Sequence, residues 1–92
     1  MAEELLVGTV VRVEQHPGAR APSLLLTVDL GPRGTHEVVL ATGAYEPASL
    51  EGGQLVCRFE EDGPVVAAAQ SHGGGLVLLR PDREVEPGTI VA

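Results

Sequence analysis

Three histidines and one cysteine are the side chains in this sequence most often used for catalysis or metal binding. His16, His36 and His72 lie far apart along the chain, and Cys57 is the single cysteine. A metal site needs several such ligands brought together. Ser71 directly precedes His72, but adjacent residues of a strand point to opposite faces, so the two do not form a nucleophile–base pair. The sequence therefore predicts no enzyme, no metal and no cofactor.

Two other segments resemble known chemical motifs only superficially. Glu60, Glu61 and Asp62 are consecutive carboxylates that could hold a divalent cation, but a solvated hairpin tip is the better interpretation. Residues 73–75 are three glycines, yet a phosphate-binding loop also needs a lysine, and the chain contains none. A bulge or hinge is the better interpretation of these glycines.

Contact with phosphate is the remaining chemistry that the sequence offers. All six basic residues are arginines, against 13 acidic residues, and the formal net charge is −7. RNA binding rests on cationic side chains that neutralise phosphates, so a local group of arginines must act against the overall charge. Arg20, in the turn after the first apolar run, is the leading candidate. The further candidates are Arg12, Arg33 and Arg58, with Tyr45 as a base-stacking platform.

Short apolar runs, separated by turns rich in glycine and proline, must position these residues. Their composition and alternation predict strands at residues 5–14, 23–30, 36–41, 54–59 and 64–70. Residues 47–50 predict one helical turn between the third and fourth strands, because proline is tolerated at a first helical position. Residues 76–79 predict one more apolar strand, and residues 89–91 a short extended piece at the C-terminal end.

Alternation within the runs predicts which side chains face the core. In the first run it places Val7, Thr9, Val11 and Val13 together on one face. In the second and fourth runs the predicted inward residues are Leu24, Leu26, Val28 and Leu30, then Leu55, Cys57 and Phe59.

Together these features predict an all-β protein with a single domain spanning residues 1–92. Evenly spaced short strands favour a sandwich or a barrel, and a five-stranded Greek-key barrel is the oligonucleotide-binding (OB) fold. Periodicity alone does not separate this barrel from an SH3-like one. The acidic start and the absence of a long apolar run predict a cytoplasmic protein with no membrane span.

Four stretches add information because of their order. They are Val-Gly-Thr-Val-Val at residues 7–11 with His-Pro-Gly-Ala-Arg at 16–20, Leu-Thr-Val-Asp-Leu-Gly at 26–31, Tyr-Glu-Pro through Leu-Glu-Gly at 45–52, and Ser-His-Gly followed by a leucine at 71–76. In order and spacing they resemble the tRNA-binding domain family. This family includes CsaA-type secretion chaperones and the C-terminal appendage of some methionyl-tRNA synthetases. The resemblance implies an OB fold, binding of tRNA or other structured RNA, and a homodimer.

The sequence also departs from the family pattern. Thr42-Gly43 stands for the usual Ser-Gly pair, Gly74 replaces a methionine, and the segment before the first strand is shortened. Residues 58–64 carry acidic side chains where the family has a lysine-containing loop, and this loop is one wall of the OB groove. Carboxylates there repel phosphate, which supports a second hypothesis: a protein-interaction or chaperone-like module that has lost RNA binding and whose partner is a client protein.

Overall fold

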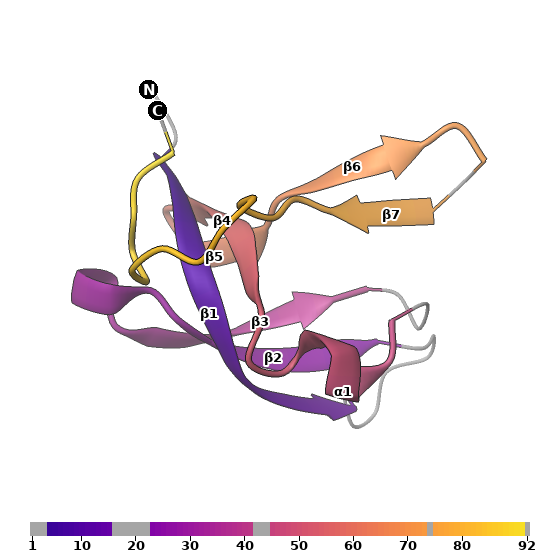
Figure 1. Cartoon of the computed structure of the whole chain (residues 1–92), viewed down its shortest axis with the longest axis horizontal. Coiled ribbons are helices and arrows are strands. Elements are labelled where there is room, and N and C mark those ends of the chain that lie inside the picture. The colour runs from indigo at the N-terminus through magenta and orange to yellow at the C-terminus, as the bar shows by residue number, and fades with distance from the viewer. Residues whose placement is uncertain (1–3, 16–22, 42–44, 74, 92) are drawn as a thin grey trace.

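The computed structural model describes residues 4–15, 23–41, 45–73 and 75–91 (Figure 1). These residues form seven strands, a 3-10 turn and one short helix. In chain order they are β1 (Glu4–Gln15), β2 (Leu24–Asp29), η1 (Gly31–Arg33), β3 (Thr35–Leu40), α1 (Pro47–Leu50), β4 (Gln54–Glu60), β5 (Gly63–Val66), β6 (Ala68–Ser71) and β7 (Gly75–Leu78).

Five antiparallel strands in the order β3-β2-β1-β4-β5 make the central sheet. β1 is long enough to serve two partners: its first half pairs with β4 and its second half with β2. This sharing curls the sheet, so that the edge strands β3 and β5 come into contact and nearly close a barrel. The helix α1 lies between β3 and β4, as predicted. The predicted five-stranded OB-type barrel is therefore confirmed.

The prediction for the faces of the first strand is wrong in its second half. The pairing of β1 with β2 shifts register between Val10 and Arg12, which marks a β-bulge. A bulge adds one residue and reverses the alternation beyond it. Leu6 and Val10 are buried on the core face before the bulge, and Val13 packs against the core after it, whereas Val11 is 50% exposed.

The barrel interior is filled by aliphatic side chains from all the long strands. The predicted inward residues of β2 and the following Leu30 are buried, as are Leu55 and Cys57 of β4, while Phe59 packs against them partly exposed. Burial raises the pKa of the Cys57 thiol to about 11, because the thiolate would lose its hydration. Cys57 is therefore a neutral core side chain.

The predicted fifth strand is two strands. It breaks at the buried Ala67, so that β5 stays in the barrel and β6 leaves it to pair with β7 in a separate hairpin (Figure 1). After β7, residues 79–91 return along the start of β1. The backbone amides of Gly88 and Val91 donate to the carbonyls of Val7 and Leu5 at 2.7 and 2.8 Å. We call residues 79–91 the C-terminal strap.

No helix in the described part of the chain has the length and apolar character needed to cross a membrane.

Candidate nucleic-acid interface

Arg33 lies at the end of the barrel where β1 begins. Its guanidinium forms an ion pair with Glu4 and sits over the ring of Phe59, 5.0 Å from the ring centroid. His36 packs edge-on against the same ring, with ring centroids 5.6 Å apart. Cation–π and ion-pair contacts together fix the direction of the Arg33 side chain. Arg33 and His36 thus both contact the ring of Phe59.

Arg58 and Arg12 each contact a carboxylate of their own strand. Arg58 lies 2.7 Å from Glu60, and Arg12 lies 3.1 Å from Glu14. Each pair is two residues apart on one strand, where side chains share a face. All four side chains are at least partly exposed, so each pair contributes at most about 1 kcal/mol to stability. The nearby carboxylates nevertheless offset the positive charge that a phosphate would meet.

The three candidate arginines in the described residues are spread along β1. Arg33 contacts Glu4 at the start of β1, and Arg58 of β4 lies opposite Leu5 of β1. Arg12 is eight residues from Glu4 along the same strand, at most about 26 Å away at the rise of an extended chain. Arg20 lies outside the described residues. The predicted RNA-binding roles of these four arginines stay predictions.

Tyr45 joins the segment before α1 to the outer hairpin. Its hydroxyl donates to the carbonyl of Leu76 at 3.3 Å and accepts from the amide of Leu78 at 3.1 Å. Its ring packs partly buried against the core. The residue holds β7 in place, and its predicted role in base stacking stays a prediction.

The outer face of β1, β2 and β3 carries two rows of side chains that follow the strand register. Arg12, Thr27 and Glu37 form one row, and Glu14, Leu25 and Val39 form the next. Inward neighbours on the same strands are buried, so both rows face outward. This mixed face has no excess of positive charge.

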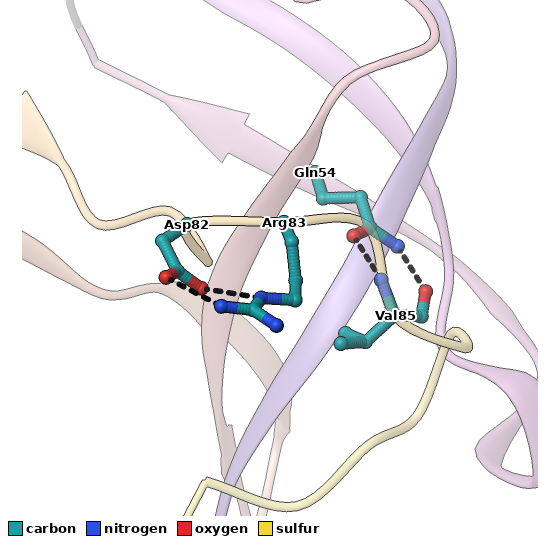
Figure 2. Close-up of polar contacts among 4 residues, drawn as sticks. All are labelled: Gln54, Asp82, Arg83 and Val85. Atoms are coloured by element: carbon teal, nitrogen blue, oxygen red, sulfur yellow. Dashed lines mark hydrogen bonds and ion pairs between the residues drawn. The ribbon is translucent and has the colours of Figure 1, made fainter.

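A shallow pocket of about 220 Å³ lies between the loop after α1 and the C-terminal strap. Residues 52–54 form one side, and Arg80, Pro81, Arg83 and Glu84 form the other. Figure 2 shows how the two sides are joined: the Gln54 amide donates to the carbonyl of Val85 at 2.7 Å and accepts from its amide at 3.0 Å.

The sequence reasoning missed Arg80 and Arg83 as candidates. They follow the last strand at a spacing of three residues and are interrupted by Pro81 and Asp82. Two arginines so close together outside a predicted strand were the sequence feature that could have indicated this site. Their approach to residues 52–54 depends on the return of the chain across the barrel, which no local pattern predicts.

The strand order and the nearly closed barrel define an OB-type module. No family model matches the sequence. The structure superposes on that of the chaperone CsaA from Bacillus anthracis with a TM-score of 0.88 and 28% identity, covering 98% of this chain and 91% of that one.

Two curated proteins are related in sequence. The methionine–tRNA ligases of Methanococcoides burtonii and Nitrosomonas europaea are 29% and 32% identical over 96% and 92% of this chain. The chain spans only 14% and 13% of the length of these two ligases. The chain belongs to the tRNA-binding domain family, the OB-fold family of CsaA and the C-terminal domain of methionyl-tRNA synthetases, across nearly its whole length.

Proposed function

We propose that the chain binds structured RNA, with tRNA as the favoured species, and performs no catalysis. The observation that carries this proposal is the similarity of nearly the entire chain to part of two methionine–tRNA ligases. The whole barrel corresponds, rather than one motif. The OB fold also supports the proposal, since its strands and loops commonly receive oligonucleotides.

The charges of the site predict weak binding that depends strongly on salt. Arg12, Arg33 and Arg58 each have a carboxylate partner, and an RNA phosphate must compete with it. The net charge of −7 adds a general repulsion at low salt. Each arginine–phosphate contact contributes about 0.7–0.9 to the slope of log K against log salt. With a few contacts, the expected slope lies at roughly −2 to −4.

A mobility-shift titration of labelled total tRNA at low salt tests the proposal. We expect a dissociation constant in the range of about 1–100 μM, because even nonspecific binding reaches these values. Binding should weaken about tenfold or more between 50 and 200 mM salt. A chain that gives no shift at about 100 μM protein does not bind RNA, and the proposal then fails.

A protein client is the second candidate partner. The arginines paired with carboxylates and the exposed Val39, beside the half-buried Leu25 on the outer face, favour it. The related CsaA structure is that of a chaperone, which points the same way. A labelled unfolded polypeptide, titrated in parallel with tRNA, separates the two candidates. Saturable polypeptide binding without any tRNA shift would favour the client.

We further propose that the chain forms a homodimer in the cytoplasm, as the resemblance and the sequence lead us to expect. Exposed apolar side chains on the C-terminal strap support pairing: Ile90 is 63% exposed, and Val91 is also exposed. Light scattering on the purified protein should give about twice the monomer mass of 9.5 kDa. A mass near the monomer value at about 100 μM would rule out a stable dimer with a micromolar dissociation constant.

A further inference from the structure

We propose that the pocket formed by Arg80, Arg83 and residues 52–54 binds a phosphate group of the RNA backbone. This inference rests on the proposed function and assigns a specific place to it. The pocket lies between the C-terminal strap and the loop after α1, and its described lining includes none of Arg12, Arg33 and Arg58. It therefore moves the expected RNA contact to a different part of the surface.

Arg80 and Arg83 carry the most available positive charge in the described part of the chain. Within that part, no carboxylate lies within ion-pair distance of Arg80, whereas Arg12, Arg33 and Arg58 all have one. Arg83 contacts Asp82 at 3.4 Å, but the two side chains are 79% and 84% exposed. Such a solvated pair of adjacent residues is worth little, so Arg83 can turn to a phosphate at small cost.

The two sides of the pocket are fixed relative to each other. The side-chain amide of Gln54 donates one hydrogen bond to the backbone of Val85 and accepts another from it. Its nitrogen also donates to the Thr9 hydroxyl at 3.0 Å. The amide of Gly52 donates to the carbonyl of Val10 at 2.7 Å, which ties the loop to β1. A site held in this way loses little conformational entropy when a ligand binds.

The size and chemistry of the pocket suit one group of a longer chain. Its volume of about 220 Å³ is below the roughly 300–1,000 Å³ of pockets that enclose whole small molecules. Two guanidinium groups present planar sets of donors that match phosphate oxygens. Glu84 also lines the pocket and opposes an anion, so binding of free phosphate should be weak. In an RNA strand the phosphates are linked, so contacts made by neighbouring phosphates raise the effective concentration of the one at the pocket. This effect offsets the repulsion by Glu84.

Arg12 can add a further contact to the same strand of RNA. The loop of the pocket bonds to the backbone of Val10, and Arg12 is two residues further along β1. At strand spacing the backbones of Val10 and Arg12 are at most about 7 Å apart, so Arg12 lies on the part of β1 that borders the loop of the pocket. Arg33 and Arg58 lie toward the opposite end of β1.

The double variant R80A/R83A tests the assignment directly. In the tRNA mobility shift we expect at least a tenfold loss of affinity at low salt and a salt slope reduced by about 1–2. Both side chains are exposed, so urea unfolding should give an unchanged midpoint. A variant that folds normally and binds tRNA as the wild type does would overturn the phosphate site and leave RNA binding itself intact.

Two matched single changes locate the contact. E84Q and E61Q each remove one negative charge, the first in the pocket and the second in the turn between β4 and β5. We expect E84Q to tighten tRNA binding by about two- to fivefold at low salt and E61Q to have a smaller effect. A larger effect of E61Q would move the RNA to the β4–β5 turn and refute the pocket. A wild-type protein with no tRNA shift would refute both the pocket and the proposed function.

Discussion

Replacing Gly88 with alanine is expected to lower the free energy of unfolding by about 2–5 kcal/mol. Gly88 has a φ of +87°, a conformation that costs an L-residue energy. In addition, an added Cβ would lie 2.5 Å from the carbonyl oxygen of Leu30 and 2.9 Å from the Cδ of Pro32. Backbone cannot give way as a flexible side chain can, so the C-terminal strap must separate from η1 and lose its hydrogen bonds to β1.

Gly52 is the matched control for this experiment. Its φ of +85° is almost the same, but nothing lies within 4 Å of the position that a Cβ would take. G52A should therefore show only the conformational cost, about 1–2 kcal/mol. Urea denaturation of both variants measures the difference, which isolates the contact between the strap and η1. Equal losses for G88A and G52A would mean that the strap adds nothing to the stability of the barrel.

Replacing Leu26 with alanine is expected to cost about 3–5 kcal/mol. Leu26 is fully buried in β2, opposite Val13 of β1 and Val38 of β3. Truncation leaves a cavity between three paired strands, whose hydrogen-bonded backbones cannot move inward to fill it. Domains of this size are stable by only about 5–15 kcal/mol, so much of the margin would be lost.

Leu79 provides the same chemical change at a solvated position. It is 41% exposed just beyond β7, and L79A should cost less than about 1 kcal/mol. Thermal unfolding followed by circular dichroism compares the two variants. A small effect of L26A, similar to that of L79A, would contradict the assignment of β2 to the barrel interior.

The positions of the strands, and which of their side chains face the core, were largely predictable from the sequence. In β2 every second residue is apolar, and all of Leu24, Leu26 and Val28 are buried. The bulge at Val11 was not predictable, because valine suits either face of a strand and the extra residue is set by pairing with β2. Gly8 shows a second such contact between β1 and β2, because a Cβ there would overlap the Cγ1 of Val28.

The candidate site was less predictable than the fold. The sequence shows where the arginines are, but not which carboxylates they meet. Arg33 pairs with Glu4, which lies 29 residues away in sequence. The pocket depends on the contact of Gln54 with Val85, which lies 31 residues away. Such contacts depend on the closure of the barrel and on the path of the chain after β7, and neither has a local pattern.

The hydrogen bonding of the C-terminal strap to β1 has a topological consequence. The amide of Val91 donates to the carbonyl of Leu5 at 2.8 Å, so residues near the two extremes of the chain are direct neighbours (Figure 1). A short engineered peptide can therefore bridge them, and new termini can be opened at an exposed turn. The same closeness lets the barrel be inserted into a surface loop of a host protein without forcing the host's backbone apart.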